Sequence, residues 1–357
     1  MLGESTKQRG ILKGYLFEIA VLELLRKNGF TEFHPEHSDP AYGTLFKEDR
    51  TGFVELRGRG CWHQIDCPCD YYRLMPFTYP MRILGEVKYH KNPITKESVR
   101  EYIGVLKDIQ ENWVVSPGTS PSALRPRLME VGVFFSASGF EASAEQLAYA
   151  HGIKTISYAN NHLIDNIRSA IDDLEANHLS VRCLEHWGEF RQALIRSLQH
   201  LDPENTVYDH PCWDTRGFAT HLHRPLEQLS EALDGIRTSF FATTASGFVL
   251  QFFGEREFPG HLFRRTDRGR CRVYYEQRRN KRFYWLEFTG DQDQDSPTRF
   301  YFTPPDSLDE AAVLGGSLVL NEKERIFKYL TIDINLDGIS RNLIVELDQD
   351  WFDSIRT

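Results

Sequence analysis

The segment 130-EVGVFFSASGFEASAEQLAYAHGIKTISY-158 decides the fold class of the first part of the chain. Glu130–Ala137 is β-branched and aromatic, which is typical of a buried strand. The period of Glu141–His151 predicts a helix that ends at Gly152, and Ile153–Tyr158 predicts another strand. A strand, a helix and a strand at this spacing predict a parallel pair joined by a right-handed crossover.

Upstream segments extend this pattern toward the N-terminus. Ile11–Lys27 carries apolar residues at helical spacing, and Asn28-Gly29 follows as a stop signal. Met81–Tyr89 (MRILGEVKY) is a short apolar run that predicts a buried strand, and Lys96–Trp113 has the period of a helix. We therefore expect an α/β domain over residues 1–160.

Downstream the pattern changes from helical to strand-rich. Residues 161–205 predict a helical connector, and residues 206–357 predict a strand-rich α+β domain. In this second domain, apolar and polar residues alternate in Thr238–Gly254, Cys271–Gln277, Arg282–Thr289, Arg299–Phe302 and Phe327–Leu347.

Composition limits the function classes. The chain has 357 residues and a formal net charge of -9, so a whole-surface binder of polyanions is not expected and a nucleic-acid contact must come from a local basic patch. Six cysteines are too few for a disulfide scaffold in a chain of this length. The sequence shows neither a signal peptide nor a spanning helix, so we expect a cytoplasmic protein without a membrane partner.

Two charged residues lie on one face of the Met81–Tyr89 strand. Residues two apart in a strand point to the same side, so Glu86 and Lys88 emerge together. An exposed edge with a neutralised pair would explain them equally simply. However, Asp66 ends a short strand-like stretch 20 residues earlier, and strand pairing would bring it beside Glu86. Carboxylates with a nearby lysine are what a magnesium-dependent phosphodiesterase requires.

The first predicted helix adds a further acid. The neighbours of Glu18 at three and four residues include Tyr15 and Leu22, so Glu18 leaves from the apolar face, whereas Glu23 neighbours Arg26 and is expected to be solvated. A carboxylate on a core-facing stripe is costly unless it is paired or bound to a metal. A partly buried salt bridge would also explain Glu18.

The order of an acidic helix, Asp66 and Glu86-Val87-Lys88 resembles the PD-(D/E)XK nuclease superfamily, and the 130–158 segment resembles the closing half of Mrr-like restriction endonuclease domains. This resemblance covers residues 10–160 and implies a mixed central sheet flanked by helices. By resemblance Asp66 and Glu86 are metal ligands, the Val87 carbonyl is a further ligand, Lys88 is the catalytic lysine and Glu18 is the helix acid. The chain departs from the family after Asp66, where Cys67-Pro68-Cys69 stands in place of the expected Gly- or Ala-containing turn.

Residues around Asp66 carry weaker signals. His63 is expected to be a packed or hydrogen-bonded histidine, and Gln64 shares the face of Asp66 and could contact DNA or water. The set Cys61, His63, Cys67 and Cys69 lacks the C-x2-4-C pairs of zinc fingers, so buried free thiols are expected in place of a zinc site.

Basic residues of two segments are candidate contacts to nucleic acid. In the N-terminal domain these residues are Lys91, Lys96, Arg100 and Lys107. In the second domain a basic hairpin interleaved with aromatic residues supplies Arg270, Arg272, Arg279 and Lys281. A solvated helix face and a half-buried hairpin face explain the two sets without a ligand.

The residues and the resemblance together predict an Mg²⁺-dependent endonuclease, with Mn²⁺ as a substitute ion. DNA is the expected substrate because the resembled family cuts DNA. The resemblance further implies a restriction or anti-phage defence effector, a homodimer or higher oligomer for double-strand cleavage, and a defence-system partner protein. The alternatives are a nuclease acting on RNA or single strands, and a catalytically silent nucleic-acid-binding adaptor. The second domain is expected to recognise a target or regulate cleavage.

Overall fold

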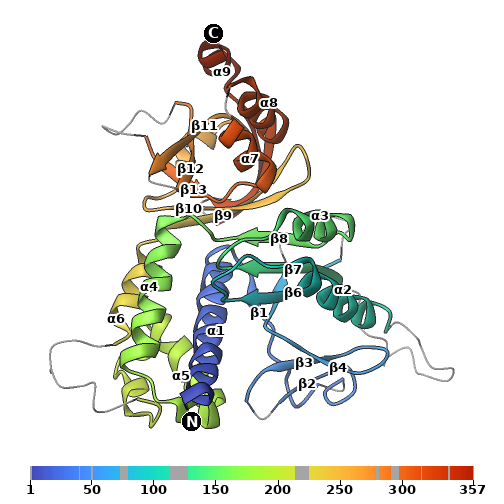
Figure 1. The fold of residues 1–357 in the computed structure, drawn as a ribbon, viewed down its shortest axis with the longest axis vertical. Coiled ribbons are helices and arrows are strands. Elements are labelled where there is room, and N and C mark those ends of the chain that lie inside the picture. The colour runs from blue at the N-terminus through green and yellow to red at the C-terminus, as the bar shows by residue number, and fades with distance from the viewer. Residues whose placement is uncertain are drawn as a thin grey trace.

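A five-stranded mixed sheet forms the centre of the N-terminal half of the computed structural model (Figure 1). The structure describes residues 2–39, 41–49, 51–72, 79–112, 128–213, 225–278, 281–290, 297–314, 316–336 and 338–356. The strand order is β1-β5-β6-β7-β8, with antiparallel pairing from β1 to β6 and parallel pairing from β6 to β8. The strands are β1 (Thr31–Glu32), β5 (Cys67–Tyr71), β6 (Met81–Lys88), β7 (Met129–Ser136) and β8 (Lys154–Ser157).

The parallel pair predicted from residues 130–158 is confirmed, since β7 and β8 are parallel neighbours joined through helix α3 (Ala142–Ala150). Side chains alternate along β7 as a strand requires: Val133 and Phe135 enter one hydrophobic core, and Phe134 enters another. The apolar run in β6 is likewise buried on both faces.

Helices cover both faces of this sheet. One core holds α1 (Leu2–Lys27), α4 (His162–Asn177), α5 (Trp187–Leu198) and α6 (Glu227–Asp234), and the other holds α2 (Lys96–Gln110) and α3. The predicted helix Ile11–Lys27 is thus the larger part of α1. Helix α2 ends at Gln110, three residues before the predicted Trp113. The boundaries at residues 160 and 205 stay predictions, although α4 and α5 share a core with α1.

A small antiparallel sheet precedes Asp66 and was not predicted. It consists of β2 (Phe46–Glu48), β3 (Val54–Arg57) and β4 (Trp62–Ile65), and its buried side chains pack against α2. The strand-like stretch before Asp66 is β4, but the strand that pairs with β6 is β5, which follows Asp66. Asp66 therefore lies at the junction of two sheets.

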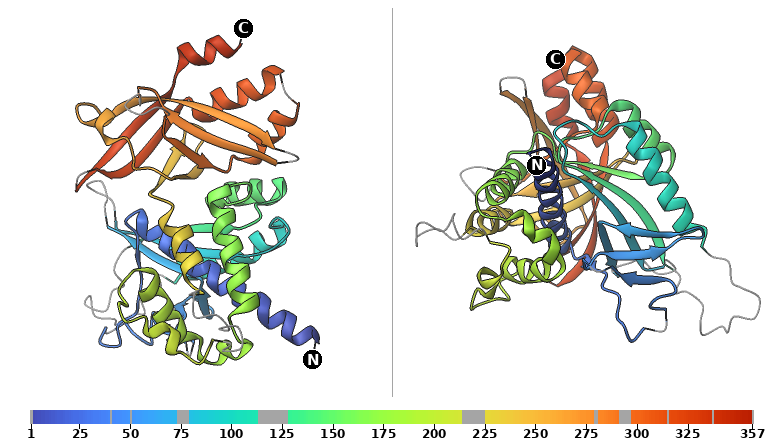
Figure 2. Two further views of the ribbon diagram at one scale, coloured as in Figure 1. Left: turned by 90° about the vertical axis from the view of Figure 1, so that its left-hand side faces the viewer. Right: turned by 60° about the horizontal axis from the view of Figure 1, so that its bottom comes forward.

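The C-terminal half contains a closed barrel with strand order β10-β13-β12-β11-β15-β14-β9 (Figure 2). Its strands are β9 (Thr238–Thr244), β10 (Val249–Gly254), β11 (Arg268–Arg278), β12 (Lys281–Phe288), β13 (Arg299–Phe302), β14 (Tyr329–Leu336) and β15 (Ile339–Leu347). The helices of this half are α7 (Asp306–Leu314), α8 (Gly316–Phe327) and α9 (Gln349–Arg356). Each alternating segment predicted for this half contains strand, and closure explains the many buried phenylalanines inside.

Short 3-10 helices lie at Val181–His186, Thr206–Asp209 and Gly260–Phe263. Within the described ranges, none of the helices combines the length and the apolar character that a membrane span needs.

Candidate active site

Asp66 lies beside Glu86 and Lys88 because β5 and β6 pair in antiparallel register. Cys67 is opposite Gly85, so the residue before Cys67 reaches the next position of β6. There the Asp66 carboxylate takes the place of the backbone carbonyl of a neighbouring strand, because its Oδ2 accepts a hydrogen bond from the Val87 N–H at 3.0 Å. The Lys88 ammonium lies 3.4 Å from the same Oδ2 and forms an ion pair with Glu86.

The electrostatics of these three residues are coupled. Burial lowers the pKa of Lys88, but the charges of Asp66 and Glu86 outweigh it and raise that pKa overall. Burial, followed by repulsion from Asp66, raises the pKa of Glu86. Lys88 is therefore an ammonium ion at neutral pH, suited to hold a water or a phosphate oxygen and unsuited to remove a proton.

Glu18 reaches the same place from α1. Its side chain is buried, and the pKa of its carboxyl is raised well above the ordinary value by burial and by the charge of Asp66. Arg191 of α5 and Lys88 act in the opposite direction. We refer to the following residues as the polar cluster: Glu18, Asp66, Glu86 and Lys88.

The prediction that Glu23 is solvated is wrong. Glu23 is 3% exposed, and it accepts hydrogen bonds from Arg26 at 2.8 Å and from Gln199 at 2.7 Å. The residue spacing within α1 gave no sign of Gln199, because that partner lies on the segment after α5.

The donor set of the polar cluster fits a hard divalent cation. One buried carboxyl group, Glu18, and two half-buried ones, Asp66 and Glu86, surround one lysine, and the pKa values of Glu18 and Glu86 are raised partly because the acids repel one another. Carboxylate and carbonyl oxygens are the ligands that Mg²⁺ prefers, and Asp66, Glu86 and the Val87 carbonyl would supply them. The carboxylate oxygens of Glu18, Asp66 and Glu86 do not all lie within 4.8 Å of one another. Among the described residues, one set of three His, Cys, Asp or Glu side chains has its ligand atoms that close, and it lies elsewhere.

The four residues weighed as a zinc set are separated. Cys67 and Cys69 are buried free thiols in β5 with their sulfur atoms 3.9 Å apart, as expected. Cys61, at the turn into β4, is an exposed free thiol, so the expectation that it is buried is wrong. Both Cys61 and His63 of β4 lie next to Asp108 of α2. His63 is half-buried and hydrogen-bonded to Asp108 at 2.7 Å. No local pattern around His63 indicates Asp108, which is 45 residues away from it.

The candidate nucleic-acid contacts of the N-terminal half are exposed. Lys91, Lys96 and Lys107 are exposed, and Arg100 is 3.6 Å from Glu97 on the same helix. Gln64 is exposed on β4. These positions allow contact with a polyanion, and their role stays a prediction.

The basic hairpin of the barrel is largely neutralised. Arg270 pairs with Asp350 at 3.2 Å and Arg272 with Asp348 at 2.8 Å. Lys281 is 3.9 Å from Asp165 of α4. Arg279 lies outside the described residues. Nucleic-acid binding by this hairpin stays a prediction, and the ion pairs leave less free positive charge than the sequence implied.

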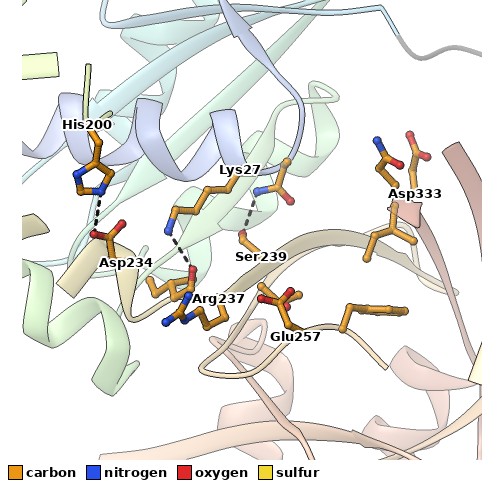
Figure 3. A pocket seen from close by; sticks show the side chains of 13 residues that line it. Lys27, His200, Asp234, Arg237, Ser239, Glu257 and Asp333 are labelled. Carbon is orange, nitrogen blue, oxygen red and sulfur yellow. Dashed lines mark hydrogen bonds and ion pairs between the residues drawn. The ribbon is translucent and has the colours of Figure 1, made fainter. Parts of the chain in front are cut away.

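A pocket of about 620 Å³ lies where the end of α1 meets the barrel (Figure 3). Lys27 and Arg237 face it together with Asp234 and Glu257, so its charges of opposite sign are mixed. Its lining includes no member of the polar cluster, so this pocket is not the place where the carboxyl groups of that cluster meet.

Comparisons with known proteins do not assign the chain. No protein-family model and no curated protein matches it. Among solved structures it is similar to the crystal structure of a protein of unknown function, AF1548, with 12% identity over 51% of this chain and 98% of that chain. The TM-score is 0.27, which is too low to carry an argument about fold or function.

Proposed function

We propose that the chain is a metal-dependent endonuclease that hydrolyses DNA phosphodiester bonds at the polar cluster. The observation that supports this most directly is the position of Asp66, which belongs to no strand and yet contacts both the Val87 amide and the Lys88 ammonium. Asp66, from the junction before β5, thus meets Glu86 and Lys88 of β6 close to the buried Glu18 of α1.

In this mechanism each residue has a role that follows from its environment. Asp66 and Glu86, with the Val87 carbonyl, would hold Mg²⁺ or Mn²⁺, which polarises the phosphate and acidifies a water. Lys88, kept protonated by its two carboxylate neighbours, positions the attacking water and stabilises charge on the phosphate oxygens. Glu18 orders water at the back of the site.

The defining experiment incubates the full chain with duplex DNA, single-stranded DNA and RNA, in Mg²⁺, Mn²⁺ or EDTA. Cleavage of duplex DNA is expected with either ion and not with EDTA. Asp66→Asn and Lys88→Ala should each lower the cleavage rate by at least about 100-fold, since the first removes a carboxylate ligand of the ion and the second removes the positive charge beside the reacting phosphate.

Two exposed positions provide matched controls, Glu204→Gln for the carboxylate and Lys7→Ala for the lysine, and both variants should cut like the parent. Cleavage of RNA alone would replace the proposed substrate class and keep the chemistry. DNA binding that survives Lys88→Ala, with no cleavage by any form, would contradict the nuclease and favour a silent adaptor.

A role in restriction or anti-phage defence is proposed on the family resemblance alone. Phage plating on cells that express the parent or Asp66→Asn tests it, and equal plating on both would contradict it.

A further inference from the structure

Three chemically different metal-binding groups meet on the surface between the small sheet and α2. The Cys61 sulfur lies 3.4 Å from His63 Nε2 and 3.9 Å from Asp108 Oδ2, and His63 Nε2 lies 2.7 Å from the same oxygen. In a tetrahedral zinc site with bonds of about 2.0–2.3 Å, ligand atoms are separated by roughly 3–4 Å. The three atoms therefore nearly have the mutual spacing that one ion would impose.

The backbone around Asp108 is built to hold its carboxylate in place. The N–H groups of Gly60 and Cys61 donate to Asp108 Oδ1 at 2.9 Å and to Oδ2 at 3.3 Å. A Cβ atom at Gly58 would lie 2.0 Å from Asp108 Oδ2, so only glycine allows this approach. Outer contacts of this kind orient the ligands of metal sites.

We propose that Cys61, His63 and Asp108 bind one Zn²⁺ ion, with the fourth position open to solvent. Thiolate and imidazole select zinc over magnesium, so this site is distinct in chemistry from the polar cluster. Binding releases the thiol proton of Cys61, and the Nε2 proton that His63 donates to Asp108 leaves as the imidazole changes to the tautomer protonated on Nδ1, which frees the Nε2 lone pair for the ion. Because the ligands come from β4, the turn before it and α2, the ion fastens the small sheet to the helix, and β4 leads directly into Asp66.

The cysteine inventory makes a direct test practical. Cys61 is exposed, whereas the other cysteines are buried: Cys67, Cys69, Cys183, Cys212 and Cys271. Iodoacetamide applied to the folded, metal-free full chain should therefore modify Cys61 first, which mass spectrometry locates. Added Zn²⁺ should slow this modification at least about tenfold, because a coordinated thiolate is no longer a free nucleophile. Co²⁺ in place of Zn²⁺ should give a thiolate-to-metal absorption band.

Substitutions of the ligands distinguish a coordinated ion from a nonspecific effect of Zn²⁺ on the chain. Asp108→Asn and His63→Gln should lose the protection by Zn²⁺, and Cys61→Ser should lose the cobalt band. Glu111→Gln, which alters an exposed carboxylate near the end of α2, and Asp66→Asn, which alters the polar cluster, should both keep the protection. Protection that persists in Asp108→Asn, or is lost in Asp66→Asn, would overturn the proposal. Modification at an unchanged rate in Zn²⁺ would overturn it equally.

Discussion

Glu18 is a carboxyl group that is 6% exposed and has a pKa raised well above its ordinary value by burial and by Asp66. The unfolded chain ionises this group near pH 4.5, whereas the folded chain resists ionisation. A raised folded pKa gives a contribution to stability that is present at low pH and is lost as pH rises. Without metal, the contribution of Glu18 to the free energy of unfolding should therefore fall as the pH increases above about 4.5.

Glu18→Gln removes this penalty. We expect the variant to raise the free energy of unfolding at pH 7 by roughly 1–3 kcal/mol, and the gain should shrink toward pH 4. Denaturant melts of parent and variant across this range, in EDTA, measure the difference. Glu23→Gln is the matched control, because Glu23 is also buried on α1 but is paired, so its variant should be less stable. A gain that does not vary with pH would contradict the account.

Single residues also show where sequence reasoning reaches its limit. The apolar stripe of α1 correctly predicted that Glu18 is buried, because the stripe depends only on residues within the helix. Glu23 and Asp108 were misjudged or overlooked because their partners, Gln199 and His63, lie far away in the sequence. A local pattern can show that a charged residue is near the core, but it cannot show which distant group compensates it.

At the level of elements, the pairing of β5 with β6 sets the geometry of the polar cluster. The two strands approach closely at Gly85, where a Cβ atom would lie 2.7 Å from the carbonyl oxygen and 2.8 Å from the Cβ of Cys67. A backbone oxygen in a strand cannot move alone. Gly85 is next to Glu86 and opposite the residue that follows Asp66, so a change in strand separation moves both acids.

We expect Gly85→Ala to lower the free energy of unfolding by about 1–3 kcal/mol through overpacking, and to reduce cleavage further than this loss explains. Gly104→Ala is the control, since a Cβ there meets nothing within 4 Å and the residue is in α2. That substitution should raise stability by about 0.5–1 kcal/mol. Chemical melts and cleavage rates of both variants test the pair. If Gly85→Ala is as stable as the parent, β5 and β6 must lie farther apart at Gly85 than the distances to Cys67 indicate.

The elements themselves divide into those with a local signal and those without one. Periodicity identified α1, β6, α2 and the strand, helix and strand of residues 130–158. The strand-like stretch before Asp66 is β4, but its partners β2 and β3 were missed because they have three and four residues, too few for an alternation to stand out. The barrel strands were anticipated, but closure was not, because it depends on the β9–β14 and β11–β15 pairings between distant segments.

Considered as a whole molecule, the α/β half and the barrel are joined by polar contacts. The Tyr158 hydroxyl donates to Gln251 at 2.8 Å, and Thr303 donates to the Ala159 carbonyl at 2.6 Å. On α3, Glu145 accepts the N–H of Asp306, the first residue of α7, at 3.3 Å. Sequence patterns gave no sign of these contacts, since each spans more than 90 residues. The contact at Glu145 differs from the others because it brings two acids together.

The contribution of the Glu145–Asp306 contact to stability should depend on pH. Burial, and then repulsion from Asp306, raises the pKa of Glu145 to about 7, and burial raises the pKa of Asp306 to about 6. Both folded values exceed the unfolded ones, so this contribution to stability is complete below about pH 4 and is lost as pH rises to about 7.

Glu145→Gln should therefore be more stable than the parent at pH 8 by roughly 1–3 kcal/mol and equal to it near pH 4. Limited proteolysis should likewise separate the two halves faster at pH 8 than at pH 5 in the parent, and at similar rates in the variant. Glu141→Gln alters an exposed acid at the start of the same helix and should leave both profiles unchanged. The stability profile of Glu145→Gln could instead follow that of the parent from pH 4 to 8. In that case the carboxyl groups of Glu145 and Asp306 do not lie together in a partly buried contact. The contact between α3 and α7 must then be looser than the hydrogen bond from Asp306 implies.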